Sequence, residues 1–155
     1  MSAVIFLRHA KSDWHAGATD DLSRPLANRG RVAAAAIGSF LADVGHIPDL
    51  VLCSPAVRTR QTVEIAIAAG DWPCPIEIVD ELYYGTVENT VKLACKRQVP
   101  LLMLVGHEPT MSSALEYLTG AELRMPTGAL ARVNLNPDNS GLLEWLLPPR
   151  LLTDS

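Results

Sequence analysis

The chain has 155 residues and a formal net charge of −4, and hydrophobic residues make up 48% of it while charged residues make up 19%. This composition is typical of a folded globular protein and excludes a disordered or collagen-like chain, and the length predicts one domain that spans residues 1–155. The acidic balance argues against nucleic-acid binding, because that activity needs an excess of Lys and Arg on one face.

The first two-thirds of the chain alternates between predicted strands and predicted helices. Short apolar runs rich in Val, Ile and Leu are typical of strands that are buried on both faces. They occupy residues 3–7, 50–53, 76–79 and 101–105. Apolar side chains at helical spacing predict helices over residues 32–44 and 58–69. Gly45 is expected to stop the first helix, and Gly70 is expected to supply the left-handed residue that closes the second.

Two further helices and a hairpin complete the predicted fold. The helices cover residues 87–96, with Thr86 as the N-cap, and residues 109–119. Residues 130–135 and 142–147 flank a run of turn-forming residues, which predicts an antiparallel hairpin. Together these elements predict an α/β fold, a three-layer sandwich with a mostly parallel central sheet, helices on both faces and an antiparallel edge strand.

Neither a membrane span nor a signal peptide is expected. The apolar runs fall well short of the ~18 residues that cross a bilayer, and Arg8 and His9 interrupt the first run where a signal peptide would continue. The three cysteines are too few and too far apart for a disulfide scaffold or a CxxC zinc site. These features predict a cytoplasmic protein without membrane contact. Separately, the tail after about residue 148 is expected to be loosely held.

Charged and polar side chains follow the predicted strands. Arg8 and His9 come directly after the first strand, and His107 follows the fourth. Arg58 follows the second strand, and Glu81 follows the third. Ligands of an open parallel sheet bind outside the carboxyl ends of its strands. Polar groups after four separate strands therefore favour one functional site over unrelated surface residues.

These residue types fit phosphoryl chemistry. Two arginines and a histidine can hold the oxygens of a phosphoryl group, and a neutral histidine can attack phosphorus to form a covalent phosphohistidine. Positive charges disfavour the protonation of a nearby histidine, so Arg8 and Arg58 are expected to keep His9 neutral and nucleophilic. A protonated His107 is expected to add to this effect.

Four segments carry most of these residues. They read Leu-Arg-His-Ala at 7–10, Arg-Pro-Leu at 24–26 with Gly30 after it, Ser-Pro-Ala-Val-Arg-Thr-Arg-Gln-Thr at 54–62, and Val-Gly-His-Glu-Pro at 105–109. In this order they resemble the signature segments of the histidine phosphatase superfamily, which has the phosphoglycerate-mutase-like fold. The resemblance extends from residue 4 to about residue 135, and in detail and shortness the chain is most similar to SixA-like phosphohistidine phosphatases.

The resemblance implies roles for individual residues. His9 would be the nucleophile that is transiently phosphorylated, and the phosphate pocket would consist of Arg8, Arg58 and His107. Arg24 would be a further substrate contact, and Lys11 and Ser12 lie beside the pocket where they could also touch substrate. Glu81 stands where mutase-like relatives carry a proton-donating carboxylate, and it is either that donor or a surface residue.

Several other classes of site are absent from the sequence. A cysteine phosphatase needs Cys-x5-Arg, but Thr59, Asp80 and Leu101 stand six positions after the three cysteines. A P-loop and a glycine-rich dinucleotide turn are both missing. The four histidines lack the paired spacing of a zinc site. A metal-independent reaction without a cofactor is predicted.

Only about seven residues separate the third strand from the next helix, too few for a lid over a small metabolite. An open site predicts a phosphohistidine-bearing protein as the substrate, with phosphate or a mimicking anion in the pocket. A small-molecule phosphomonoesterase remains the alternative, and a phosphoprotein-binding module without turnover is the non-enzyme alternative. Mutase activity is disfavoured because a lidless pocket would hydrolyse the phosphoenzyme. A monomer is expected because no long apolar surface stripe stands out.

Overall fold

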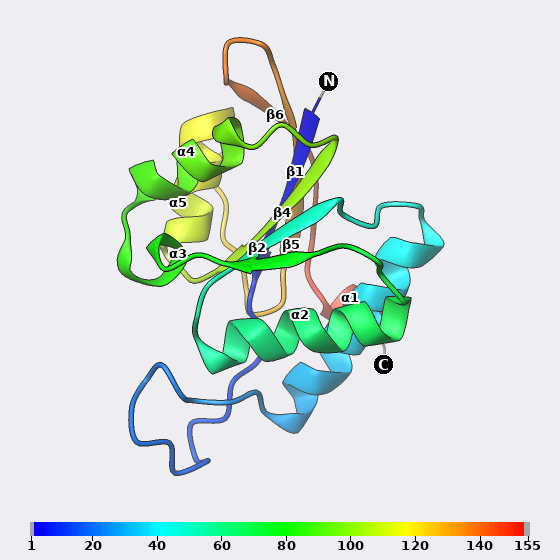
Figure 1. Ribbon diagram of the computed structural model, residues 1–155, viewed down its shortest axis with the longest axis vertical. Coiled ribbons are helices and arrows are strands. Elements are labelled where there is room, and N and C mark those ends of the chain that lie inside the picture. The colour runs from blue at the N-terminus through cyan, green and yellow to red at the C-terminus, as the bar shows by residue number, and fades with distance from the viewer. Residues whose placement is uncertain (1, 154–155) are drawn as a thin grey trace.

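The computed structural model describes residues 2–153 and contains one mixed sheet of six strands (Figure 1). The strand order across the sheet is β3-β2-β4-β1-β5-β6. The strands are β1 (Ser2–Arg8), β2 (Leu50–Cys53), β3 (Ile76–Ile78), β4 (Leu101–Gly106), β5 (Leu130–Leu135) and β6 (Gly141–Leu147). All six lie at the predicted places along the chain, which confirms the α/β fold.

The parallel part of the sheet and its antiparallel part occupy different ends. β1 pairs in parallel with β4, and β2 pairs in parallel with both β4 and β3. β5 pairs antiparallel with β1 and with β6, so the predicted hairpin extends the sheet at one edge. Because β1, β2 and β4 run in the same direction, their carboxyl ends meet at one side of the sheet.

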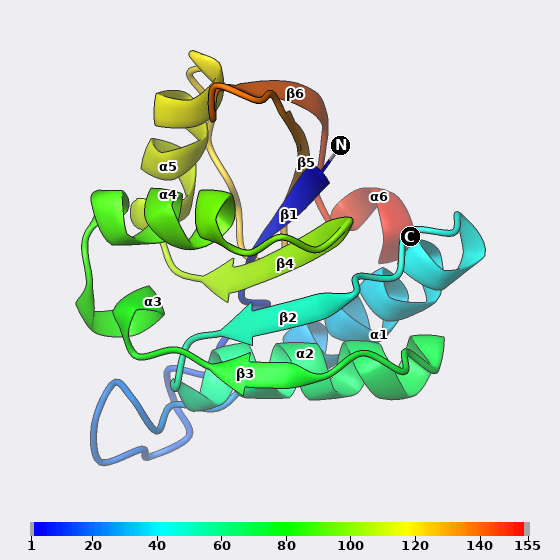
Figure 2. The same cartoon turned by 45° about the horizontal axis from the view of Figure 1, so that its top comes forward.

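Helices cover both faces of the sheet and complete the three layers (Figure 2). They are α1 (Asn28–Asp43), α2 (Val57–Gly70), α3 (Glu81–Tyr84), α4 (Val87–Lys96), α5 (Thr110–Thr119) and α6 (Arg150–Thr153). α1, α2 and α6 lie on one face, and α3, α4 and α5 lie on the other (Figure 2). Within residues 2–153, no helix is long and apolar enough to cross a membrane.

The core is divided by the sheet into two apolar clusters, and β1 contributes to both. Val4 and Phe6 pack in the cluster under α4 and α5, while Ile5 and Leu7 pack in the cluster under α1 and α2. Successive strand side chains point to opposite faces. A strand covered on both faces is therefore apolar at every position, which is why the sequence of β1 shows a continuous apolar run.

Two sequence-based expectations about local structure were wrong. β3 was expected to be buried on both faces, but Ile76 is 38% exposed and Ile78 is 49% exposed, because β3 is an edge strand. Gly70 was expected to be the left-handed residue after α2, but Asp71 takes that conformation, with φ of 54°. Gly70 is instead the last helical residue, and a Cβ there would lie 2.2 Å from the carbonyl oxygen of Gly38 on α1.

The start of α4 agrees with the predicted N-cap, whereas α1 starts earlier than its apolar stripe predicts. Thr86 caps α4 as predicted, and its hydroxyl accepts a hydrogen bond from the backbone N–H of Asn89. α1 begins at Asn28, before the first residue of its apolar stripe. The end of the described chain forms the short helix α6, and Leu152 packs against the cluster under α1 and α2.

Candidate active site

The site lies at the carboxyl edge of the parallel strands, where four predicted residues come together. In Figure 2 the arrowheads of β2 and β4 point to the same side of the sheet, where α3 lies. Arg8 is the last residue of β1 and His9 follows it, while His107 follows β4 next to them. Arg58 stands in the first turn of α2, and its side chain reaches His107.

His9 is held in one orientation by its neighbours. Its side chain is buried, and its ring Nδ1 lies 2.7 Å from the carbonyl oxygen of Ala10. A carbonyl accepts only, so Nδ1 carries the proton and Nε2 keeps a free lone pair. The backbone is fixed too: His9 N–H donates to Gly106, Gly128 N–H donates to His9, and Ala10 N–H donates to the hydroxyl of Thr62 at 3.0 Å.

The electrostatic surroundings keep His9 neutral. Burial lowers the pKa of His9 to about 4, and the positive charges of Arg58, Arg8 and Arg24 act in the same direction, against the hydrogen bond to Ala10. A buried imidazolium loses hydration and is repelled by nearby guanidinium groups. At neutral pH the ring is therefore an uncharged base with an available nitrogen.

His107 differs from the sequence-based expectation of a protonated imidazole. Burial, the charge of Arg58 and the neighbouring His9 ring lower the pKa of His107 to about 3, so it is neutral without a ligand. Arg58 Nη2 donates to its Nδ1 at 3.3 Å, and its Nε2 lies 2.8 Å from the hydroxyl of Ser54. The two rings are 5.3 Å apart between centroids. An anion between these groups would add the negative charge that protonation needs.

Two arginines present buried N–H groups that have no protein acceptor. Arg8 Nη1 donates to the carbonyl of Met125 at 2.9 Å, but its Nε has no hydrogen-bond partner among residues 2–153. Arg58 is 5% exposed, and its Nε is buried and equally without a partner in that part of the chain. Buried polar groups are nearly always hydrogen-bonded, so these unmet donors beside His9 indicate a place for an anion.

Sequence reasoning missed Asp21, which binds two arginines, and Tyr83, which binds Asp21. The carboxylate of Asp21 accepts from Arg58 at 2.9 Å, from Arg24 at 2.5 Å and from the hydroxyl of Tyr83 at 2.7 Å. The Tyr83 ring also packs edge-on against His107, with centroids 5.3 Å apart. The available signal was the position of Asp21 three residues before Arg24, within reach of an ion pair.

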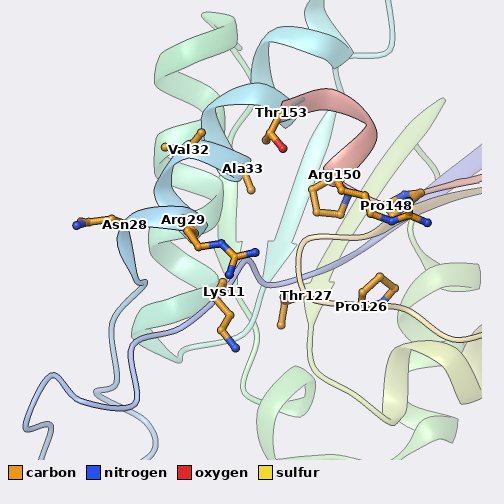
Figure 3. Close-up of a pocket in the computed structure, with 11 residues that line it drawn as sticks. Lys11, Asn28, Arg29, Val32, Ala33, Pro126, Thr127, Pro148, Arg150 and Thr153 are labelled. Atoms are coloured by element: carbon orange, nitrogen blue, oxygen red, sulfur yellow. The ribbon is translucent and has the colours of Figure 1, made fainter. Parts of the chain in front are cut away.

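The remaining predicted site residues are placed differently from one another. Arg24 is buried beneath Trp14, and its Nε donates to the hydroxyl of Ser12 at 3.0 Å, so Ser12 faces an arginine. Lys11 is exposed and lines a neighbouring hollow of about 470 Å³ between α1, α6 and residues 126–127 (Figure 3). Glu81 is exposed on α3, and its carboxylate makes no hydrogen bond or ion pair within residues 2–153.

Residues 2–153 contain no group of three or more His, Cys, Asp or Glu side chains that could hold a metal ion. The charged groups around His9 are arginines instead, which bind the oxygens of a phosphoryl group through paired N–H donors. The arrangement therefore combines a neutral nucleophile with fixed anion donors.

A family comparison agrees with this geometry. The sequence model of the histidine phosphatase superfamily, branch 1, matches residues 4–103. The chain belongs to this superfamily. An uncharacterised protein of Mycobacterium leprae is 30% identical to this chain over 144 residues, which cover 83% of the chain and 87% of the relative. SixA of Escherichia coli, a phosphohistidine phosphatase, is 25% identical over 152 residues, which cover 94% of the chain and 93% of the relative.

The length of the relatives varies. The chain spans 62% of an uncharacterised chloroplastic protein of Arabidopsis thaliana, to which it is 30% identical over 135 residues, or 80% of this chain. Solved structures match over nearly the whole chain. A candidate SixA phosphohistidine phosphatase of Agrobacterium tumefaciens is 34% identical, with a TM-score of 0.85 over 96% of this chain and 98% of that chain.

A SixA structure complexed with tungstate is 24% identical and has the same fold, with a TM-score of 0.87 over 97% of this chain and 99% of that chain. The superfamily and these neighbours support a phosphatase. The predicted resemblance is thereby confirmed at the level of the family and the SixA-like fold.

Proposed function

We propose that the protein is a protein phosphohistidine phosphatase that acts through a covalent phosphohistidine on His9. The observation that carries the proposal is the state of His9: a buried, neutral ring with its Nδ1 proton on Ala10 and its Nε2 free. The Nε–H groups of Arg8 and Arg58 beside it, which have no partner within residues 2–153, supply donors for the phosphoryl oxygens.

The proposed first step transfers the phosphoryl group to the enzyme. Arg8 and Arg58 bind its oxygens, and the lone pair of His9 Nε2 forms a bond to phosphorus as the bond between phosphorus and the substrate nitrogen breaks. The leaving imidazole departs neutral, because its other ring nitrogen has already taken a proton from solvent. The Nδ1 proton of His9 stays hydrogen-bonded to Ala10 throughout.

In the second step water attacks phosphorus and the bond to His9 Nε2 breaks. The electron pair of that bond returns to the ring, and the proton released by the water goes to solvent or to the departing phosphate. His107 contributes to both steps, because the charge of a phosphoryl dianion raises the pKa of an adjacent imidazole. The protonated ring then donates a charge-assisted hydrogen bond to that dianion.

The openness of the edge supports a macromolecular substrate. β3 ends at Ile78 and α4 begins at Val87, and the four-residue helix α3 is the only element between them. Lids that enclose small substrates are built from longer loops. The match covers 98% and 99% of the lengths of the two SixA structures, so neither carries a long insertion that this chain lacks.

The test is hydrolysis of a phosphohistidine-bearing phosphotransfer protein beside a panel of phosphoesters, without added metal. We expect selective loss of phosphohistidine with the wild type and at least about a thousandfold less with His9→Ala, because removal of a nucleophile removes the covalent route. His15→Ala is the matched control, since His15 is exposed and outside the site. Rapid turnover of one small ester, with the phosphoprotein left intact, would identify a small-molecule phosphomonoesterase instead.

A further inference from the structure

Asp21 connects Arg24 and Arg58 to Tyr83 on α3. Its carboxylate oxygens accept hydrogen bonds from Arg24 Nη1, Arg58 Nη2 and the Tyr83 hydroxyl. Its backbone carbonyl accepts another from Arg58 Nη1 at 2.7 Å. The Asp21 side chain is 49% exposed, whereas that of Arg58 is 6% exposed, so the carboxylate lies at the mouth of the site and the guanidinium lies inside.

The guanidinium of Arg58 has one fork that Asp21 occupies fully and a second fork that protein groups occupy only in part. A guanidinium has five N–H donors in a plane, arranged as two forks. Asp21 takes the fork formed by Nη1 and Nη2, through its carbonyl and its carboxylate. The other fork consists of Nε–H, which has no partner within residues 2–153, and the second Nη2 proton, which reaches His107 Nδ1.

We propose that Asp21 is a positioning residue for phosphate binding: it holds the terminal fork of Arg58 and thereby turns the Nε fork toward the phosphoryl group beside His107. Tyr83 acts one step further out, because its hydroxyl fixes the Asp21 carboxylate. The inference rests on the proposed function, since it assigns the Nε fork of Arg58 to the substrate phosphoryl group.

A competing interpretation is that Asp21 occupies the phosphate site and must leave before substrate binds. The structure favours positioning for two reasons. The Asp21 carboxylate accepts from Arg58 Nη2 and leaves the buried Nε–H of Arg58 available for an anion. An anion that displaced the carboxylate would still find Arg58 Nη1 bound to the backbone carbonyl of Asp21. The two interpretations predict opposite effects on anion affinity, because removal of a competing negative charge would tighten binding.

The decisive experiment measures the affinity of tungstate, without turnover, by calorimetry on the wild type and on Asp21→Asn. Positioning predicts 10-fold to 100-fold weaker tungstate binding by Asp21→Asn and a similar fall in kcat/KM. The loss of a negative charge would by itself tighten anion binding. Asp20→Asn is the matched control, because within residues 2–153 this neighbouring carboxylate bonds only Ser23 and its loss changes the charge equally. Tighter or unchanged tungstate binding by Asp21→Asn, with the melting temperature preserved, would overturn the proposal.

A second variant guards against a purely structural effect. Tyr83→Phe removes one hydrogen bond from Asp21 and is expected to weaken tungstate several-fold in the wild type, but to have no effect in the Asp21→Asn background. Such non-additivity shows that Tyr83 acts through Asp21, and additive effects would contradict it. If tungstate binding follows this pattern while phosphohistidine is not hydrolysed, the proposed substrate fails and the positioning role stands.

Discussion

The pKa of His9 makes the acid side of the pH profile the sharpest test of the nucleophile. An ordinary histidine with a pKa of about 6.5 is only about 3% neutral at pH 5. Burial first, and then the nearby arginines, lower the pKa of His9 to about 4, so about nine tenths of the ring is neutral at pH 5. Attack requires the neutral form, and activity at pH 5 is therefore expected to stay within about twofold of that at pH 7.

Two measurements check this expectation. The first is kcat/KM between pH 3.5 and 8, corrected for the titration of the substrate itself. The second is an NMR titration of the ring protons, in which His9→Ala assigns the His9 signal. We expect the His9 signal to shift near pH 4, with loss of kcat/KM in the same range. A midpoint near 6.5 in both would refute the account of a buried, neutral nucleophile.

Three further effects concern stability. The unfolded chain protonates His9 below about pH 6.5 and the folded chain only below about pH 4, so the contribution of His9 to the free energy of unfolding, complete above pH 6.5, should fall by about 3 kcal/mol as the pH drops through this window. His107, whose pKa burial and then the charge of Arg58 lower to about 3, should add to the fall in the same direction. Urea unfolding at pH 7 and 4 checks this, and the fall should shrink in His9→Gln. Gly38→Ala should lower the free energy of unfolding by about 1–3 kcal/mol, because the new Cβ would lie 2.0 Å from the carbonyl oxygen of Ala66. An unchanged melting temperature would contradict this close contact between α1 and α2. Thr62→Val should lower the free energy of unfolding by a similar ~1–3 kcal/mol, because the buried N–H of Ala10 loses its acceptor. Hydrogen exchange at the Ala10 amide should become faster.

The strand-end rule is the reason that the sequence could locate the site. Buried strands are visible as apolar runs, and parallel strands end at one edge, so polar residues directly after them are brought together by topology alone. Arg8, His9 and His107 needed no further information, because they follow β1 and β4, which are neighbours in the sheet. Arg58 could be placed at the same edge by the same rule, since α2 begins only four residues after β2 ends.

The contribution of α3 was harder to predict, because a four-residue helix has no readable periodicity. The sequence pointed to Glu81, but in the structure Tyr83 faces His107 and Asp21 while Glu81 is exposed. Asp21 was missed for a related reason. It lies in a loop, and its partners Arg58 and Tyr83 are 37 and 62 residues away, a separation that no local pattern encodes.

The arginines act on the two kinds of titratable group in the site in one consistent way. Their positive charges add to burial, the larger cause, in lowering the pKa values of both histidines, and hydrogen bonds from Tyr83 and the arginines hold the pKa of Asp21 well below its usual range. The histidines are therefore neutral and the carboxylate is ionised across the physiological pH range. The site does not change its charge until a phosphoryl dianion enters, and His107 is then the group whose protonation that dianion favours. Substrate binding, rather than ambient pH, would thus switch His107 Nδ1, which accepts from Arg58 without a ligand, into a donor.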